Sequence, residues 1–368
     1  MPADLLTRRE LNRATLERQL LLRRSELPVL DAVQHLVGLQ AQEPRDPYAA
    51  LWARLQSFRP EELSGHLESR AVVRTAVMRS TIHLVTAEDC LVLRPLMQPV
   101  LDAELFRYRN LRDVDLDAVL AFGRERLSER PLSGTELRAA LAERFPAYDA
   151  ADLAYACRNL LVLVQVPPRG LWQTPGQVRS TTAESWLGRA VARNPSLDDV
   201  ALRYFGAFGP ATVADLATWS RLTGLREVVE RLRPRLKTFR GERGRELFDL
   251  SDAPRPDPEL PAPPRFLPEY DNLLLSHADR SRFVTDEQRA RLARVPGRPG
   301  GTVLHDGFVF GVWQLERQRD RGAPRLVVSH VGRLTKRAER SIAAEGRRFL
   351  RFVVEDAESH EVRFSAAD

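Results

Sequence analysis

The sequence predicts an α+β fold in which groups of helices, each closed by a pair of short strands, repeat before a strand-rich end. Three observations support this class. Apolar residues recur at helical spacing in three successive groups along the chain. Each group is followed by two short apolar stretches that a turn separates. Six prolines between Pro254 and Pro264 then form a stiff linker to the strand-rich remainder.

The first group covers residues 1–110. Its predicted helices are residues 7–21, residues 28–39, a third that begins at Asp46-Pro47, and residues 61–68. Aspartate is a favoured N-cap and proline a favoured first helical residue, which marks the third start. Because Pro44 disfavours helix at the residue before it, we expect the second helix to end near Leu39 or Gln40. Residues 72–75 and 82–85 are expected to pair as a hairpin.

The second group, residues 111–192, and the third, residues 193–253, repeat this order. Ser133 and Glu136 match a capping box before a predicted helix at residues 137–145. The other elements predicted here are helices 152–161, 197–205, 212–219 and 225–232, and strands 164–166, 171–173, 236–239 and 246–250. Three helices and a hairpin make a winged helix. We therefore predict three tandem winged-helix modules, each a helix-turn-helix plus a β-hairpin.

Residues 254–368 are predicted to form a β-rich C-terminal domain. Asp306-Gly307 is a two-residue hairpin signal between two apolar stretches. The elements predicted for this domain are strands 266–275, 302–305, 308–315, 326–331 and 361–364, and a helix at 334–351.

Composition narrows the class of protein. The chain has 368 residues, a formal net charge of +6 and a pI near 9.8, which suit a polyanionic partner without requiring one. Only Lys237 and Lys336 are lysines among its 56 basic residues. No apolar run is long enough to span a membrane, the N-terminus lacks the pattern of a secretion signal, and Cys90 and Cys157 are too few for a disulfide framework. These features predict a cytoplasmic protein.

The tripeptide Gln40-Ala41-Gln42 stands where the second predicted helix gives way to a proline-broken turn. Residues two apart in an extended segment point the same way, so Gln40 and Gln42 would face a common space and Glu43 the opposite side. Two neutral amides can hold a water or a ligand but cannot act as strong acids or bases. The alternative is that both amides only cap a helix end and meet solvent. Asp46 could act as a general base or only cap the next helix.

Other chemical signatures are missing from the sequence. It contains no nucleophile elbow, phosphate-binding P-loop, dinucleotide-binding fingerprint or zinc-protease helix motif. His277 and Asp279 have no further metal ligand at useful spacing, so we predict no metal and no cofactor. His83, among apolar neighbours, is by itself typical of a hydrogen-bonded structural histidine.

Four further motifs accompany the glutamine pair: RSTIHL at residues 79–84, FGPATVAD at 208–215, LPEYDN at 267–272 and SHADR at 276–280. Together they resemble the AlkZ/YcaQ family of bacterial DNA glycosylases, over about residues 5–364. Glutamine at the third motif position, where the YcaQ branch has aspartate, places the chain nearer the AlkZ branch. The resemblance implies winged-helix modules in a C shape around a DNA channel. It also implies excision of alkylated purines and unhooking of interstrand crosslinks, in repair or in self-resistance to a DNA-alkylating antibiotic.

The resemblance also implies a set of site residues. Gln40 and Gln42 would be catalytic, with possible support from Glu43 and Asp46. Residues expected to border the DNA channel are Arg45, Arg79, Ser80, Thr81, His83, Tyr270, Asp271, His277 and Arg280. Arg243 and Arg319 lie in two basic turns that could hold phosphates or be ordinary polar hairpin tips. His277, Asp279 and Arg280 are interpreted as an ion-paired structural corner of the channel.

The implied reaction requires few catalytic groups. Alkylation at N7 makes the purine cationic, so it leaves as a neutral base without a general acid, and placing a water becomes the main task. No lysine lies in the first module, which argues for a monofunctional glycosylase over a Schiff-base lyase. The expected partner is double-stranded DNA with N7-alkylpurine adducts or interstrand crosslinks, bound by a monomer in the cytoplasm at the nucleoid. The alternatives are a winged-helix transcription regulator and a non-catalytic scaffold for damaged DNA.

Overall fold

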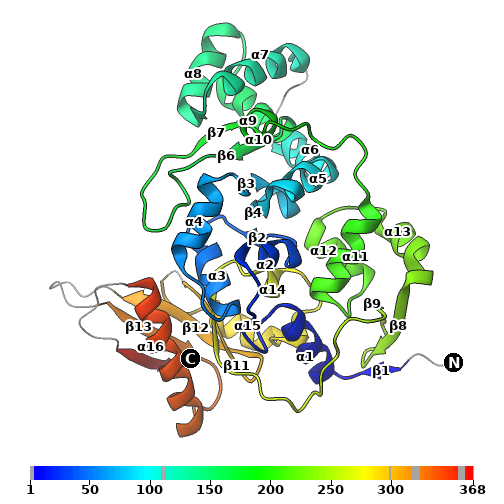
Figure 1. Ribbon diagram of the computed structural model, residues 1–368, viewed down its shortest axis with the longest axis vertical. Helices are drawn as coiled ribbons and strands as arrows, with labels where there is room; N and C mark the ends of the chain where they lie inside the picture. Colours follow the sequence, from blue (N-terminus) through cyan, green and yellow to red (C-terminus); the bar gives the residue numbers. More distant parts are fainter. Residues whose placement is uncertain are drawn as a thin grey trace.

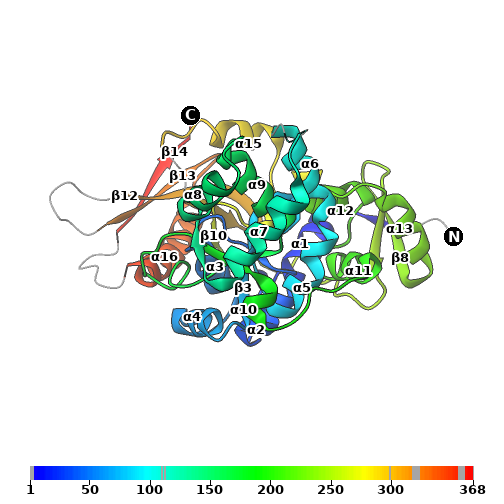
Figure 2. The same cartoon turned by 90° about the horizontal axis from the view of Figure 1, so that it is seen from above.

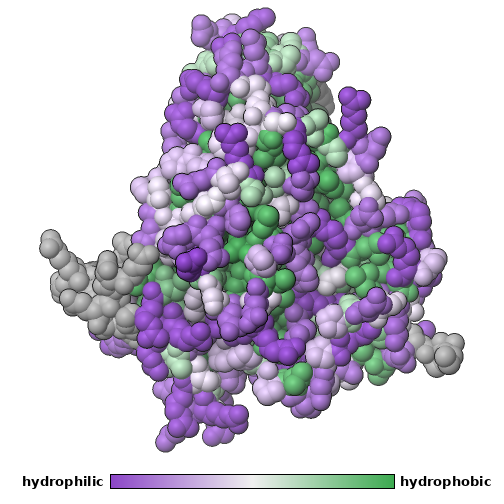
Figure 3. All heavy atoms as spheres, viewed as in Figure 1, coloured by the Kyte–Doolittle hydropathy of each residue, from purple (hydrophilic) through white to green (hydrophobic). Residues whose placement is uncertain are grey.

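A computed structural model describes residues 4–108, 111, 113–297, 300–316, 324–354 and 361–367 (Figure 1). Three sheets organise these residues, in the strand orders β2-β4-β3-β6-β7-β5, β1-β8-β9 and β10-β11-β12-β13-β14. Figure 1 places the last two at opposite sides of the molecule. Helices α7 (Leu116–Glu129), α8 (Gly134–Arg144) and α9 (Ala150–Leu160) lie at the top of that view. None of the described helices combines the length and apolar character that crossing a bilayer requires. Polar side chains cover most of the face in Figure 3, with apolar ones between them.

The six-stranded sheet carries the glutamine motif. Its strands are β2 (Leu39–Gln40), β4 (Ile82–Thr86), β3 (Val72–Ala76), β6 (Leu163–Gln165), β7 (Arg179–Thr182) and β5 (Leu132–Ser133). The predicted hairpin is confirmed, since β3 and β4 pair antiparallel from Val72 opposite Thr86 to Ala76 opposite Ile82. β2 adds to the outer side of β4, with Gln40 opposite His83. Strands from the first two predicted groups therefore share one sheet.

Six helices belong to the first group: α1 (Arg8–Arg18), α2 (Val29–His35), α3 (Asp46–Arg54), α4 (Pro60–Glu68), α5 (Ala87–Leu96) and α6 (Gln98–Tyr108). The predicted end of the second helix near Leu39 is wrong. It ends at His35 because Val37 and Gly38 take positive φ values of 55° and 88°. A Cβ on Gly38 would lie 2.7 Å from Val85 Cγ1, so the chain turns directly into β2 there. Arg45, not Asp46, is the N-cap of α3.

The second group contains α7 (Leu116–Glu129), α8 (Gly134–Arg144), α9 (Ala150–Leu160) and α10 (Ala183–Leu187). The capping box of Ser133 and Glu136 is confirmed. The predicted strand at residues 171–173 is wrong, because β6 pairs with Arg179–Thr182 instead. Trp172 packs on Tyr48 of α3 with ring centroids 4.9 Å apart, so this segment is fastened to the first group.

The third group is confirmed element by element: α11 (Leu197–Phe208), α12 (Val213–Ser220), α13 (Leu225–Leu232), β8 (Leu236–Gly241) and β9 (Glu246–Leu250). A short 3-10 turn, η2 (Arg233–Arg235), joins α13 to the hairpin. Buried Tyr204, Phe208 and Trp219 form its aromatic core. β1 (Leu5–Leu6) extends the hairpin by pairing parallel with β8, a strand that the sequence did not predict.

The C-terminal region contains β10 (Arg265–Pro268), α14 (Asn272–Leu275), α15 (Asp286–Leu292), β11 (Gly301–His305), β12 (Phe308–Glu316), β13 (Arg325–His330), α16 (Lys336–Val353) and β14 (Val362–Ala366). Figure 2 shows this sheet and α16 together at one side of the molecule. The predicted strand at residues 266–275 ends at Pro268. Asp271 then accepts a hydrogen bond from the Leu273 amide at 2.9 Å and caps the short α14. The Asp306-Gly307 turn is confirmed, with φ of 49° and 80°.

A buried ion pair joins the first group to the C-terminal region. Arg54, the last residue of α3, donates two hydrogen bonds of 2.8 Å to the carboxylate of Asp271. Each of the two side chains is only 1% exposed. A buried charge that loses its partner stays in a low-dielectric site, so removing one side of such a pair is costly.

We expect Asp271→Ala to lower the free energy of unfolding by about 3–5 kcal/mol, because it leaves the Arg54 guanidinium buried and unpaired. Glu129→Ala is the matched control, since Glu129 pairs with Arg126 at the surface, where the two side chains are 52% and 37% exposed. That change should cost less than about 1 kcal/mol. Urea unfolding followed by circular dichroism measures both, and equal losses would contradict the role given to the buried pair.

Candidate active site

The β3–β4 turn aims one arginine at the glutamine motif. The turn contains the 3-10 segment η1 (Met78–Ser80), in which Arg79 and Ser80 take left-handed φ values of 59° and 58°. Such values are unusual for residues other than glycine and are maintained only where the surroundings fix them. The Arg79 guanidinium donates to Gln40 Oε1 at 2.7 Å, Asn272 Oδ1 at 2.9 Å and the Trp219 carbonyl at 2.9 Å. It therefore joins β2, α14 and α12.

Gln40 is 7% exposed and held in one orientation. Its carbonyl oxygen accepts from Arg79, so its amide nitrogen points elsewhere. Among the described residues, that nitrogen has no hydrogen-bond partner in the structure. The Gln40 amide nitrogen is thus a fixed donor, and a water or a sugar oxygen can accept a hydrogen bond from it.

His83 supports Arg79 as a neutral base. It is fully buried, with Nδ1 3.0 Å from the Thr81 carbonyl and Nε2 3.3 Å from Arg79 Nη2. The carbonyl can only accept, so Nδ1 carries the proton and Nε2 accepts from Arg79. Burial, and then the charge of Arg79, lower the pKa of His83 to about 3. This matches the structural interpretation of His83 and keeps the ring neutral, so it takes up no second proton near neutral pH.

Gln42 lies in a different environment from Gln40. It is exposed, and its Oε1 accepts a long hydrogen bond of 3.4 Å from the Ile82 amide. It lines a hollow together with Arg74, Arg94, Arg158 and Arg169. The described residues show no hydrogen bond shared by the two glutamines, so their convergence on one water stays a prediction. The hollow beside Gln42 is strongly basic.

The carboxylates that follow the motif face a second hollow. Glu43, Arg45 and Asp46 line it together with Arg169 and Glu269. Asp46 is 8% exposed in the first turn of α3, whereas Arg45 is exposed. Arg169 lines both hollows, so its side chain lies where the two adjoin.

The remaining predicted residues differ in how much of each side chain is exposed. Ser80, Thr81, Tyr270 and Arg280 are half-buried, whereas Arg243 is exposed and donates to Asp279 at 3.0 Å. Arg319 lies outside the described residues.

Two other predicted residues, Asp271 and His277, are at most 4% exposed. His277 Nε2 lies 3.0 Å from the Phe208 carbonyl, and burial, followed by the charge of Arg282, lowers the pKa of His277 to about 4. Both side chains are engaged inside the protein.

Sequence reasoning missed two side chains of this site. Asn272 Nδ2 donates to the Gly38 carbonyl at 3.2 Å while its Oδ1 accepts from Arg79, so it links the break after α2 to the site. Arg74 donates to the Ala41 carbonyl at 2.8 Å, between the two glutamines. Burial, and then the charge of Arg169, lower the pKa of Arg74 to about 10. An arginine inside the apolar strand 72–76 was the available signal.

Comparison with known proteins identifies the family. The AlkZ-like DNA glycosylase family matches residues 33–352. The chain belongs to this family. It is 26% identical over 337 residues to an interstrand DNA cross-link repair glycosylase of Streptomyces sahachiroi, an alignment that covers 82% of this chain and 86% of that protein.

The fold agrees with the family. The structure of the Streptomyces sahachiroi DNA glycosylase AlkZ superposes with a TM-score of 0.80 at 22% identity, over 99% of this chain and all of that one. The resemblance read from the sequence motifs is thus confirmed, and the chain is a DNA glycosylase whose substrate is DNA. Within the described residues, no group of three or more histidine, cysteine or acidic side chains is placed to hold a metal ion.

The low pKa of His83 predicts acid-sensitive folding. An unfolded histidine titrates near pH 6.5, whereas folded His83 stays neutral down to about pH 3. Between these values the unfolded chain binds the extra proton, so stability falls as the pH falls through this window. We expect His83→Gln to reduce the slope of unfolding free energy against pH, between pH 4.5 and 6, by about 1.4 kcal/mol per unit. Urea unfolding at several pH values measures it, and an unchanged slope would contradict the assignment.

Proposed function

We propose that this glycosylase hydrolyses the N-glycosidic bond of N7-alkylated purines in double-stranded DNA, including purines joined in interstrand crosslinks. The observation that carries the proposal is the fixed amide of Gln40, whose carbonyl is held by Arg79 at 2.7 Å while its nitrogen remains available. The enzyme acts as a monomer in the cytoplasm and needs no cofactor. Its activity serves DNA repair or self-resistance to an alkylating antibiotic.

The reaction breaks the bond between C1′ and N9, and the electron pair moves to the cationic purine, which leaves neutral. A water then adds to the oxocarbenium-like sugar at C1′. The Gln40 amide nitrogen orients the water or a sugar oxygen, and the exposed Gln42 amide provides a second contact. The water loses its proton to solvent or to Glu43 or Asp46, which lie at the adjoining hollow.

We further propose that the chain forms three winged-helix modules, at residues 1–110, 111–192 and 193–253, and a β-rich domain at 254–368. Helices followed by antiparallel hairpins support this division, although β2–β7 run through the first two modules as one sheet. The modules and the C-terminal domain would curve around the duplex as a C. A base still bonded to the opposite strand cannot be fully flipped into a closed pocket, so an open channel suits a crosslink.

We choose the proposed DNA contacts by the exposure of their side chains. Side chains that reach the surface and would border the DNA are those of Arg45, Arg79, Ser80, Thr81, Tyr270, Arg280 and Arg243, with Arg319 added from the sequence. Because His83, Asp271 and His277 are buried and bonded within the protein, we assign them to the support of the channel wall.

The first test is single-turnover release of 7-methylguanine from duplex DNA by the wild type, Gln40→Ala and Gln42→Ala. Loss of a positioned amide should slow release by about 10²-fold or more, because such groups act on charge and geometry in the transition state. Gln34→Ala is the matched control, since Gln34 is an exposed glutamine of the preceding helix α2. It should release base at the wild-type rate.

Two outcomes would change the proposal. No release by the wild type would return the chain to DNA-binding proteins without chemistry, such as a winged-helix regulator. Release that survives both substitutions would keep the activity and move its centre to Glu43 or Asp46.

Crosslink unhooking is a separate expectation. A duplex that carries an N7-linked interstrand crosslink should be converted to separable strands by the wild type and not by Gln40→Ala, as denaturing electrophoresis shows. Wild type that releases 7-methylguanine but leaves the crosslink intact would restrict the activity to single adducts. An open channel would then be unnecessary.

A further inference from the structure

The hollow beside Gln42 collects positive charge from the first two groups of the chain. Its volume is about 510 Å³, a size typical of sites that enclose a ligand. We call it the arginine hollow, after five side chains in its lining: Arg74 of β3, Arg94 of α5, Arg138 of α8, Arg158 of α9 and Arg169 of the segment between β6 and β7. None of the described residues that line it is acidic.

Helix α9 turns one face toward the arginine hollow. Its residues in the lining lie three, four and seven positions after the first of them, and so share a face: Ala151, Ala154, Tyr155 and Arg158. The two alanines occupy little space. Arg158 is exposed, with its guanidinium 5.8 Å from the centre of the Tyr155 ring. This face of α9 therefore offers a cation beside small side chains that leave room for a ligand.

The arginines of the hollow have only neutral hydrogen-bond partners among the described residues. Most of these partners are backbone carbonyls: of Ala41 for Arg74, Asn159 and Leu161 for Arg94, Gly134 for Arg138 and Gly176 for Arg169. In the described part of the chain none of the five arginines forms an ion pair. Neutral acceptors satisfy N–H groups but leave the positive charges uncompensated.

Two of these arginines also have buried donors without an acceptor. Arg74 is only 2% exposed, yet its Nε and Nη1 have no hydrogen-bond partner among the described residues. The same is true of the buried Nε of Arg169. The charge of Glu43 acts on Arg74, but Glu43 lines the other hollow. Because a buried donor without an acceptor costs free energy, these groups favour an acceptor from outside the chain.

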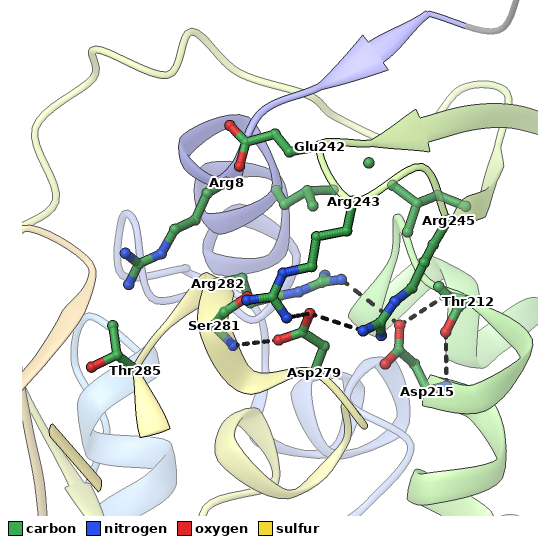
Figure 4. A pocket seen from close by; sticks show the side chains of 13 residues that line it. Arg8, Thr212, Asp215, Glu242, Arg243, Arg245, Asp279, Ser281, Arg282 and Thr285 are labelled. Atoms are coloured by element: carbon green, nitrogen blue, oxygen red, sulfur yellow. Dashed lines mark hydrogen bonds and ion pairs between the residues drawn. The ribbon is translucent and has the colours of Figure 1, made fainter. Parts of the chain in front are cut away.

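The arginines of another hollow, shown in Figure 4, are paired differently. The Asp279 carboxylate lies beneath Arg243 and Arg245, which are 3.0 and 3.6 Å from it. Arg282 in the same hollow lies 3.8 Å from Asp215. Carboxylates of the chain thus compensate the charge there, whereas the arginine hollow leaves its charge to an outside anion.

We propose that the arginine hollow holds the sugar–phosphate backbone of DNA next to the nucleotide that the glutamine pair attacks. The inference rests on the proposed function, because Gln42 is part of the lining. Exposed Arg138 and Arg158 donate to phosphate oxygens, and the buried charge of Arg74 adds to the attraction. These arginines are separate from the DNA contacts that the sequence motifs imply.

The sign of the charge selects the backbone over the damaged base. An N7-alkylpurine is cationic until its bond to the sugar breaks, so five guanidinium groups repel it. A phosphodiester is anionic, and its oxygens can accept two hydrogen bonds from one guanidinium. Phosphate contacts carry no sequence information but fix the register of a protein on the duplex. A backbone held beside Gln42 therefore sets which sugar faces the glutamine pair, in any sequence.

The first measurement is the affinity for an undamaged duplex at several salt concentrations. Each arginine that neutralises a phosphate contributes about 0.9 to the slope of log K against log salt. We expect Arg138→Gln and Arg158→Gln each to bind more weakly and to reduce the slope by about this amount. Arg144→Gln is the matched control, because Arg144 is an exposed arginine of α8 outside the lining. It should keep the wild-type slope.

The second measurement locates the backbone that the hollow holds. Single phosphates are replaced by neutral methylphosphonates, one position at a time, on both strands around 7-methylguanine. We expect wild-type binding to weaken about tenfold at one or two positions next to the lesion, which is the loss of one charge-assisted hydrogen bond. Arg138→Gln and Arg158→Gln should each lose less than about twofold at one of these positions, whereas Arg144→Gln should keep the full loss.

The outcomes separate the two proposals. Wild type that releases 7-methylguanine, with unchanged salt slopes and methylphosphonate losses in both hollow variants, would overturn the backbone site and leave the glycosylase proposal intact. Wild type that releases no base, with reduced slopes and losses in those variants, would support the backbone site and overturn the catalytic role of the glutamine pair. Sensitivity only at phosphates far from the lesion would overturn the placement beside Gln42.

Discussion

The ion pair between Arg54 and Asp271 is the interaction on which the rest of the site depends. It fixes the end of α3 to the start of α14 through two hydrogen bonds of 2.8 Å. Asn272, the next residue, is thereby placed to hold the Gly38 carbonyl and to accept from Arg79. Arg79 in turn fixes Gln40. The orientation of the Gln40 amide therefore depends on a buried pair whose members are 217 residues apart in sequence.

Neutral groups suit this chemistry because charge is moved and not created. In the reaction that we propose, the N7-alkylated purine carries a positive charge and the sugar acquires it as the base leaves, so the total charge at the site stays constant. A steady positive potential from Arg79 therefore shifts the ground state and the transition state of this reaction by similar amounts. The low pKa of His83, about 3, keeps the imidazole from adding a positive charge beside Arg79.

Local signals predicted much of the fold, and long-range contacts account for what they missed. The hairpin at residues 72–75 and 82–85, the helices and hairpin of the third group and the Asp306-Gly307 turn were correct, since periodicity and turn residues specify them. β2 was missed because only its pairing with β4, some forty residues later, makes it a strand. The motif predicted Gln40 as a catalytic residue, but the contact of Arg79 with Asn272, 193 residues away, could not be found because only tertiary packing creates it.

The position of β2 in its sheet bears on the kind of lesion the site can accept. β2 is one of the two edge strands of the six-stranded sheet, and no further strand pairs with its outer side within the part of the chain that the structure describes. Gln40 is fixed by partners on the protein side, whereas Gln42, two residues on, is exposed. A glycosylase that encloses its base needs walls on every side of the reacting sugar. The exposed Gln42, two residues after Gln40, brings the proposed site to the surface, where a base tethered to the opposite strand can approach it.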